Sequence, residues 1–354
     1  MPSKRPPRHV QSSPRDASRA KRNVTLADVA QLAGVSPITV SRALHRPELV
    51  TPETRELVQV IVERTGYSPN MLAGGLASKR SRLVAAIVPS ITNGIFVEAV
   101  EALTDRLWAA GYQVLLGLSG YPAEREESLL AAVLSRRPDA IYLTGINHSK
   151  ASRQRLLAAG IPVVETWDLT PTPVDMVVGF SHEKVGQEVA RHLHGKGYRR
   201  IGMVWADDER ARVRRQGFIA ELQRLGIDDV ATVTVAAPST LALGRGGLAE
   251  LLRRRIRRKP VDAVFCGSDL LAHGALEEAR GQSVDVPSQL AIIGFGGLEF
   301  TEHTTPALST VLVDRPAIGR IAAEIILARI EGGEGEPANR VIDVGFRIAD
   351  RGTT

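Results

Sequence analysis

Residues 24–42 of the chain read VTLADVAQLAGVSPITVSR, and this stretch decides the fold of the N-terminal part. Thr25 and Asp28 have the spacing of a capping box at the start of a helix. The apolar residues that follow recur at helical spacing, and Gly34 is suited to end the helix. Ser36 is suited to cap a second helix, with a proline in the first turn, where the missing N–H costs little. The stretch therefore predicts two short helices joined by a tight turn.

A third short helix is predicted directly after this pair. Thr51 and Pro52 form its start, and Gly66 lies past its end. Three such helices, two of them joined by Ala-Gly-Val-Ser, are typical of the helix-turn-helix, whose second helix enters the major groove. The predicted inward positions are Leu26, Val29, Ala30, Ala33, Val40, Ala43, Leu44, Leu57, Val58, Ile61 and Val62.

The quoted run, continued by Gly-Tyr-Ser-Pro-Asn at 66–70, resembles the headpiece of the LacI family of transcriptional regulators. The resemblance extends with few gaps almost to the C-terminus. It implies that Pro37, Ile38 and Arg42 face base edges, while Thr39 and Ser41 bind the DNA backbone. Arg42 is the principal candidate because a guanidinium can pair with O6 and N7 of guanine; a contact to phosphate alone is the alternative. The predicted DNA-contacting residues are Thr25, Ser36, Pro37, Ile38, Thr39, Ser41, Arg42, Asn70, Ala73 and Leu76.

Residues 70–82 resemble the hinge helix of that family. The resemblance implies that the helix forms on DNA and that Leu76, with Ala73 beside it, wedges between base pairs in the minor groove and kinks the duplex. Gly74 and Gly75 are a departure, because each lowers helix propensity by up to about 1 kcal/mol. The hinge is therefore expected to depend on DNA and on a second copy for its order; a plain linker is the alternative.

Charge and composition bound the remaining possibilities. The formal net charge is +6, and residues 1–22 account for it with seven basic residues against Asp16. This tail has few apolar residues, so it is expected to be a disordered extension or an arm attracted to phosphates. Cys266 is the only cysteine, which fits a reducing cytoplasm. No secretory signal or membrane-spanning apolar run is visible in the sequence.

From residue 83 onward, predicted strands and helices alternate, which favours an α/β fold with doubly wound parallel sheets. Two consecutive sets predict two subdomains, as in periplasmic binding proteins, with a ligand cleft between them. The predicted division is a basic tail at 1–22, a headpiece at 23–69, a hinge at 70–82 and an effector-binding and dimerisation core at 83–354. The core subdomains are predicted as 83–180 with 312–336 and 181–311 with 337–354.

No catalytic constellation is visible. The sequence has no dinucleotide-binding glycine fingerprint, no phosphate-binding P-loop and no metal-spaced His or Cys cluster, so no enzyme activity, cofactor or metal is expected. A periplasmic sugar-binding protein would share the cleft architecture, but it would need a signal peptide and no helix-turn-helix. A DNA-binding regulator is therefore the favoured interpretation.

The family resemblance also implies the residues of the ligand cleft. Arg214, three residues before Gly-Phe, occupies the position of a recurring ligand-binding arginine, with Arg212 close by. The loop after the first strand supplies Asn93 and Phe96. A packing or surface role is the alternative for each position. The full set of predicted effector contacts is Asn93, Phe96, His148, Glu165, Arg212, Arg214, Ser268, Asp269, Phe295 and Glu299.

Within the family, the chain looks most like the gluconate-repressor branch. Many members have an aspartate where this chain has Gly296-Gly297, and the loss of a carboxylate beside a retained Arg214 suits an anionic ligand. A sugar acid such as gluconate or ketogluconate is therefore the expected effector. A neutral sugar is the alternative that Glu165 and Glu299 favour, unless they bind hydroxyls or point out of the cleft. With no leucine heptad after the last predicted strand, a homodimer on a palindromic operator is expected rather than a tetramer.

Overall fold

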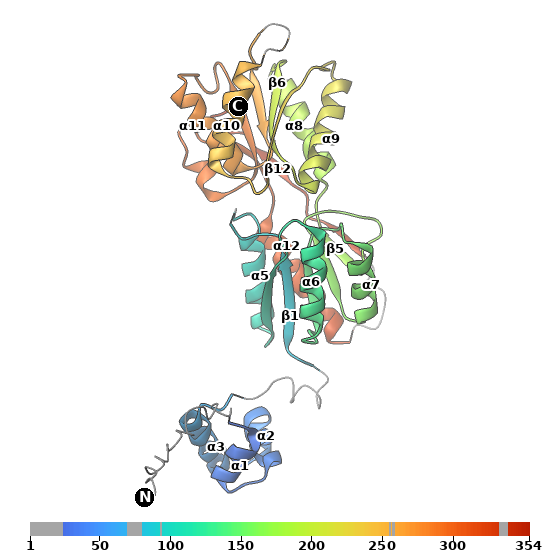
Figure 1. Ribbon diagram of the computed structural model, residues 1–354, viewed down its shortest axis with the longest axis vertical. Coiled ribbons are helices and arrows are strands. Elements are labelled where there is room, and N and C mark those ends of the chain that lie inside the picture. The colour runs from blue at the N-terminus through green and yellow to red at the C-terminus, as the bar shows by residue number, and fades with distance from the viewer. Residues whose placement is uncertain (1–23, 69–79, 93, 255, 257–258, 333–338) are drawn as a thin grey trace, which may run out of the picture. The chain divides into compact units, whose positions relative to one another are not determined.

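Figure 1 shows the computed structural model of the chain, which describes residues 24–68, 80–92, 94–254, 256, 259–332 and 339–354. The chain divides into two compact units, residues 1–79 and residues 80–354. Each unit is built around its own apolar core, so each is described by itself.

The first unit contains the three predicted helices. They are α1 (Leu26–Ala33), α2 (Pro37–His45) and α3 (Pro52–Thr65), with a 3-10 turn, η1, at Pro47–Leu49. The capping box at Thr25 and the Ser36 cap are both present, and Gly34 ends α1 in the left-handed conformation. Val29, Val40 and other predicted inward residues are buried, but Leu57 is 45% exposed, so its predicted inward position is wrong. The helix-turn-helix prediction is confirmed.

The second unit contains two six-stranded sheets. The strand order is β11-β5-β4-β3-β1-β2 in the first sheet and β12-β10-β9-β8-β6-β7 in the second. All pairings are parallel except the one between β10 and β12. The strands are β1 (Leu83–Val88), β2 (Gln113–Leu118), β3 (Ala140–Thr144), β4 (Val163–Thr166), β5 (Met176–Gly179), β6 (Ile201–Ala206), β7 (Ala231–Val235), β8 (Ala263–Cys266), β9 (Ala291–Gly296), β10 (Ser309–Leu312), β11 (Val341–Asp343) and β12 (Arg347–Ala349).

Helices cover both faces of each sheet (Figure 1). Helices α5 and α12 cover one face of the first sheet, and α6 and α7 cover the other. Helices α8 and α9 cover one face of the second sheet, and α10 and α11 cover the other. These helices are α5 (Val97–Trp108), α6 (Ala123–Leu134), α7 (Lys150–Ala159), α8 (His182–Gly195), α9 (Glu209–Arg224), α10 (Leu241–Arg253), α11 (Asp269–Gly281) and α12 (Arg315–Ile330). The predicted α/β class with two parallel-sheet subdomains is thus confirmed.

The chain passes between the two sheets three times. It crosses after β5, after β10 and again between β11 and β12. Of the residues 337–354 predicted for the second subdomain, Val341–Asp343 belong to the first sheet instead, because β11 pairs with β5. Strand β12 lies in the second sheet, where it pairs with β10. The third crossing comes only at residues 344–346.

Residues 80–82 were predicted as the end of the hinge, but they belong to the second unit. The backbone N–H groups of Ser81 and Arg82 donate to the carboxylate of Asp139 at 2.9 and 2.7 Å. Arg80 also donates to the carbonyl oxygen of Ile330 at 2.8 Å. These contacts fix the segment directly before β1 to the core unit.

Candidate functional site

The outer face of α2 carries the side chains predicted to read DNA. Pro37 and Arg42 are exposed, and Ile38 is 65% exposed. Thr39 is half-buried, and its backbone N–H donates to Ser36 Oγ at 3.2 Å. Among the described residues, Ile38 is not part of the apolar core of the headpiece, so this face of the helix is suited to an external surface.

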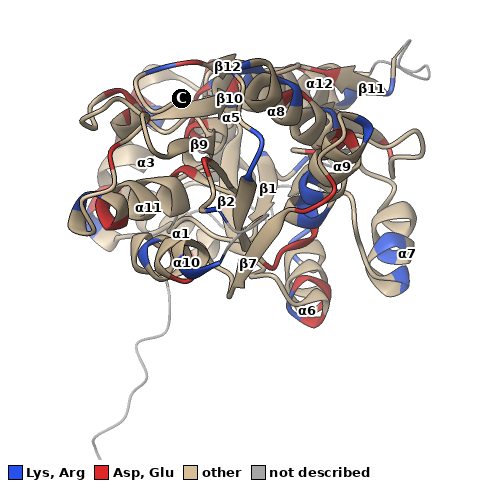
Figure 2. Cartoon of the chain, turned by 90° about the horizontal axis from the view of Figure 1, so that it is seen from above, with Lys and Arg blue, Asp and Glu red and all other residues tan. Residues whose placement is uncertain are grey.

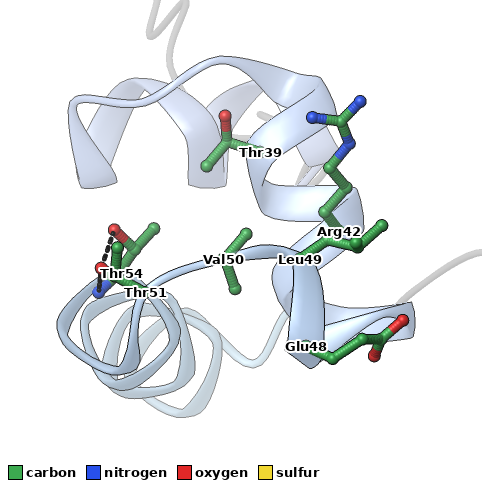
Figure 3. A pocket seen from close by; sticks show the side chains of 7 residues that line it. All are labelled: Thr39, Arg42, Glu48, Leu49, Val50, Thr51 and Thr54. Atoms are coloured by element: carbon green, nitrogen blue, oxygen red, sulfur yellow. Dashed lines mark hydrogen bonds between the residues drawn. The ribbon is translucent and has the colours of Figure 1, made fainter.

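A hollow of about 480 Å³ lies beside α2 (Figure 3). It is lined by Thr39, Arg42, Glu48, Leu49, Val50, Thr51 and Thr54. The Arg42 side chain extends outward from α2, whereas Glu48 lies on the far side of the turn (Figure 3). Because the Arg42 guanidinium is exposed, its donors are available for a base edge or a phosphate.

Thr25 and Ser36 act inside the headpiece as helix caps. Thr25 Oγ1 donates to the Asp28 carboxylate at 2.7 Å, and Ser36 Oγ lies 2.9 Å from Thr39 Oγ1. Each bond lies at the start of one helix, Thr25 at α1 and Ser36 at α2. The DNA contacts predicted for these two residues remain predictions. Asn70, Ala73 and Leu76 lie outside the described residues.

In the second unit, two adjoining cavities lie where the carboxyl ends of the two sheets meet. The larger has a volume of about 230 Å³ and the smaller about 50 Å³. They share Tyr121, Asp208 and Arg210. The smaller cavity is also lined by Ile95, Phe96, Trp167, His182, Arg214, Ser239, Gly267, Ser268 and Phe295. Parallel strands commonly place ligands beyond their carboxyl ends, so this junction is the candidate effector site.

Five of the predicted effector residues line these cavities. Phe96, Arg214, Ser268 and Phe295 line the smaller one, and Arg212 lines the larger one. Asn93 lies outside the described residues. These five residues come from both subdomains, which is the arrangement expected of a ligand cleft.

Arg214 is the central cation of the smaller cavity. It is only 4% exposed, and its guanidinium carbon lies 3.8 Å from the centre of the Phe295 ring. Nη1 bonds to His182 Nδ1 at 2.9 Å, and Nη2 donates to the carbonyl oxygen of Gly267 at 3.1 Å. Burial lowers the pKa of Arg214 to about 10, so the group is still a cation at neutral pH.

Arg210 and His182 line the smaller cavity, but sequence reasoning did not single them out. Arg210 lies one helical turn before Arg214, and its guanidinium carbon is 5.3 Å from the centre of the Phe96 ring. The i, i+4 spacing to Arg214 was a usable signal. His182 is the first residue of α8, just beyond the carboxyl end of β5, and this position was also a usable signal.

Glu165 and His148 were predicted as effector contacts, but the structure places them in a buried ion-pair cluster. Glu165 lies on β4 with its side chain on the same face as Val163, toward α6 and α7. Its Oε2 accepts from the backbone N–H of Val174 at 2.6 Å, and its Oε1 lies 3.2 Å from His148 Nε2. His148 Nδ1 is 2.9 Å from Glu126 Oε1. Neither Glu165 nor His148 lines the larger or the smaller cavity, so these two cavities give the predicted effector contacts no support.

Asp269 and Glu299 also differ from the prediction. Asp269 is fully buried, and its two oxygens accept from Thr310 Oγ1 at 2.5 Å and from the backbone N–H of Leu298 at 2.7 Å. Burial raises its pKa to about 6. The Glu299 side chain is 90% exposed and points out of the cleft. Asp269 therefore braces the 296–298 turn, and Glu299 adds no charge to the cavities.

Other carboxylates stand at the wall of the larger cavity. They are Glu126, Asp168, Asp207, Asp208 and Glu209. Asp208 caps α9 by accepting from the backbone N–H of Ala211 at 2.9 Å, and Asp207 lies 3.3 Å from Arg212 Nε. Burial raises the pKa of Asp168 above its ordinary value. Helix α9 carries both basic and acidic residues (Figure 2). The site therefore offers guanidinium donors for an anion and carboxylate acceptors for hydroxyl groups.

Within the described part of the chain, no helix combines the length and apolarity that a membrane crossing requires. Groups of three or more His, Cys, Asp or Glu arranged to hold a metal are likewise absent from the described residues.

Known proteins share both units of this chain. Residues 25–70 match the profile of bacterial regulatory proteins of the lacI family, and residues 190–354 match a periplasmic binding protein-like domain. The HTH-type transcriptional regulator GntR of Pseudomonas aeruginosa is 39% identical over 93% of this chain and 95% of its own length. GntR of Escherichia coli K12 is 33% identical over 94% of this chain and 99% of its own.

A solved structure agrees with these relatives. The crystal structure of a LacI-family transcriptional regulator from Silicibacter pomeroyi superimposes with a TM-score of 0.86 and 37% identity, over 93% of this chain and 99% of that chain. A helix-turn-helix together with a two-subdomain ligand-binding core defines a DNA-binding regulator rather than an enzyme. The chain belongs to the LacI family of bacterial transcriptional regulators.

Proposed function

We propose that this regulator is a homodimeric repressor that binds a palindromic operator and responds to a small polyol carrying a carboxylate, such as gluconate or a ketogluconate. The observation that carries the proposal is Arg214. Its Nε is buried and lacks a hydrogen-bond partner among the described residues. A buried N–H without an acceptor costs free energy, and a ligand carboxylate supplies a charge-assisted acceptor.

The Gly296-Gly297 turn supports an anionic ligand. Both residues have positive φ values, 131° and 71°, which L side chains rarely adopt. A Cβ atom at Gly297 would also overlap the side chain of Leu312. An aspartate is therefore disfavoured here, and the turn presents backbone in place of a carboxylate that would repel an acid.

The acidic wall supports a ligand that is rich in hydroxyls. Asp168 and Asp208 line the cavities within the same site as Arg210 and Arg214. Carboxylates accept hydrogen bonds from hydroxyl groups, whereas the two guanidiniums only donate. One carboxylate and several hydroxyls in a single small molecule match this mixture. The same acidic wall favours a neutral sugar as the second candidate.

An apolar surface supports the homodimer. Trp108, at the end of α5, is 69% exposed, and Leu116 and Leu118 on the edge strand β2 are 42% and 44% exposed. Exposed aromatic and aliphatic side chains of this kind are typical of an interface core. A second copy would cover them and pair two headpieces on a two-fold symmetric operator. Because a bacterial transcriptional regulator acts on DNA inside the cell, we place the protein in the cytoplasm.

Calorimetry tests the effector class. Gluconate, 2-ketogluconate, glucose and sucrose would be titrated into the full chain, its Arg214→Gln variant and an Arg224→Gln control, whose side chain is 66% exposed on the same helix. We expect a sugar acid to bind the chain and the control, and to bind Arg214→Gln at least tenfold more weakly. Tight binding of a neutral sugar that is unchanged in Arg214→Gln would contradict the proposal.

A further inference from the structure

His182 connects the two subdomains through hydrogen bonds. Its Nε2 lies 2.8 Å from the carbonyl oxygen of Trp167, which directly follows β4 of the first sheet. Its Nδ1 lies 2.9 Å from Nη1 of Arg214, on a helix of the second subdomain. Arg214 then donates to the carbonyl oxygen of Gly267, which directly follows β8 of the second sheet. Three hydrogen bonds thus run in series from one sheet to the other.

The partners of His182 determine its protonation. A guanidinium has only donors, so Nδ1 must accept from Arg214 and carry no proton. A carbonyl oxygen only accepts, so Nε2 must carry the proton and donate it to Trp167. The imidazole is therefore the neutral Nε2–H tautomer. Burial, together with the charges of Arg214 and Arg210, holds the pKa of His182 well below its ordinary value, which agrees with this assignment.

Buried aromatic rings surround His182 and Arg214 and restrict the orientations that the two side chains can adopt. His182 is 2% exposed, and its ring lies 4.7 Å from the centre of Phe180 and 5.9 Å from that of Phe295. Its charged neighbours are Arg214 and Arg210, both from α9. The Phe295 ring also stacks on the Arg214 guanidinium, so the same aromatic ring packs against both His182 and Arg214.

We propose that His182 is a positioning residue for the effector: it accepts from Nη1 of Arg214 and so fixes the guanidinium in the orientation in which its unpartnered Nε–H meets the ligand. The inference rests on the proposed anionic effector for its ligand and on the hydrogen-bond geometry for its mechanism. Preorganised donors bind more tightly because their orientation is fixed before the ligand arrives. Without His182, Arg214 would lose the partner on one of its two terminal nitrogens.

A measurement without ligand tests the geometry. The full chain, which has eight histidines, would be labelled with ¹⁵N-histidine and studied by long-range ¹H–¹⁵N spectroscopy from pH 5.5 to 8.5. We expect one ring with a protonated Nε2 and a bare Nδ1 throughout this range, absent from His182→Asn and with a shifted Nδ1 signal in Arg214→Gln. A His182 ring that titrates between pH 6 and 7, or an Nδ1 signal unchanged in Arg214→Gln, would overturn the inference.

A binding measurement tests the consequence. Sodium gluconate would be titrated into the full chain, His182→Phe and His182→Asn. The phenylalanine keeps the ring but removes both hydrogen bonds, so we expect the affinity to fall at least tenfold. The asparagine Oδ1 can take the place of Nδ1 and accept from Arg214, although the shorter side chain gives up the bond from Nε2 to Trp167. Because the bond that positions Arg214 is kept, we expect an affinity within threefold of that of the unaltered chain.

The outcomes separate the two proposals. If folded His182→Phe binds gluconate as tightly as the unaltered chain, His182 does not position Arg214, although the effector assignment stands. If the unaltered chain binds neither sugar acid, the effector assignment fails, and the histidine spectra alone decide whether His182 holds Arg214. If His182→Phe does not fold, a folded His182→Asn variant with gluconate affinity reduced more than tenfold would overturn the inference, since the amide oxygen keeps the bond to Arg214.

Discussion

Gly186 of α8 lies directly against the backbone carbonyl of Arg214 on α9, so closely that a Cβ atom at Gly186 would overlap that oxygen. The contact is reciprocal, because a Cβ atom at Gly217 of α9 would overlap the carbonyl oxygen of Glu183 on α8. Two glycines thus let the helix backbones touch. This close approach sets the distance between His182 and Arg214 at the cavity.

Substitution of Gly186 by Ala should therefore destabilise the core unit. The added methyl group meets backbone rather than a flexible side chain, so α8 and α9 must separate, and overpacking of this kind costs about 1–3 kcal/mol. Denaturant unfolding would measure the change. Gly195→Ala on the same helix is the matched control, because a Cβ atom there meets nothing within 4 Å. Equal stability of the two variants would contradict the packing argument.

Arg315 is the first residue of α12, where the chain passes from the second sheet back to the first sheet, and its hydrogen bonds stabilise this second crossing. Its guanidinium donates to both carboxylate oxygens of Glu98 on α5, at 3.1 and 2.7 Å, and to the carbonyl oxygen of Gly296 at 2.8 Å. Arg315 is 6% exposed, whereas the Glu98 side chain is 41% exposed. Because Glu98 remains partly solvated, we expect Arg315→Ala to lower the free energy of unfolding by about 1–3 kcal/mol. Breaking a fully buried ion pair would lower it further.

The same helix supplies the comparison for Arg315. Arg320 lies 3.4 Å from Glu324, with exposed fractions of 56% and 48% for the two side chains. Exposed pairs on a helix contribute about 0.3–0.5 kcal/mol, so Arg320→Ala should shift the urea midpoint only slightly. If Arg315→Ala lowers the free energy of unfolding no more than Arg320→Ala does, the contact between Arg315 and Glu98 does not stabilise the crossing.

The buried cluster around His148 should make stability depend on pH. Burial lowers the pKa of His148, but hydrogen bonds and charges from Glu126 and Glu165 outweigh it and raise the pKa to about 9. A raised pKa in the folded state stabilises the protein fully below the unfolded value of about 6.5. This contribution, at most about 3 kcal/mol, is lost as the pH rises from 6.5 through 9.

Unfolding free energies at pH 6, 7.5 and 9 would measure this dependence. The free energy of unfolding of the unaltered chain should fall from pH 6 to pH 9. In His148→Gln it should fall less, because the contribution of the His148 charge is missing. His303→Gln, at a side chain that is 71% exposed, should follow the unaltered chain. Parallel curves for His148→Gln and the unaltered chain would mean that His148 is not charged in the fold.

Arg42 should contribute to operator specificity. If its exposed guanidinium pairs with a guanine, Arg42→Ala weakens the free energy of operator binding by about 1–3 kcal/mol for each half-site. On an operator without that guanine, the variant and the unaltered chain should bind equally. Mobility-shift titrations would measure both effects. Arg64→Ala, in the last turn of α3, is the control and should bind the operator as the unaltered chain does. A uniform loss on every DNA sequence would assign Arg42 to phosphate instead.

The headpiece was predictable from sequence because its determinants are local. Thr25 and Asp28 lie three residues apart, as do Ser36 and Thr39, and the structure shows both hydrogen-bonded caps. Leu57 was misplaced because a helical pattern does not distinguish the edge of a buried stripe from its centre. The alternating α/β pattern of the core was predictable for the same local reason.

The cleft was predictable only in part. Arg214 and Phe295 followed from a family resemblance, whereas Glu165 and Asp269 are turned toward partners far along the chain. Which face of a strand meets a cavity depends on how the helices cover the sheet, and periodicity alone does not determine this. The position of His182 beyond β5 was a usable signal, but its pairing with Arg214 was not predictable, because the two residues lie 32 positions apart. Contacts of this kind arise from packing, not from spacing.

The late return of the chain to the first sheet, in β11, has a consequence for synthesis on the ribosome. The first sheet ends in β11 (Val341–Asp343), whose partner β5 (Met176–Gly179) is translated more than 150 residues earlier. The edge of β5 stays open until nearly the whole chain has emerged. Unpaired strand edges are exposed to aggregation, and contacts distant in sequence form slowly. The nascent chain should therefore depend on protection of this edge until translation is almost complete.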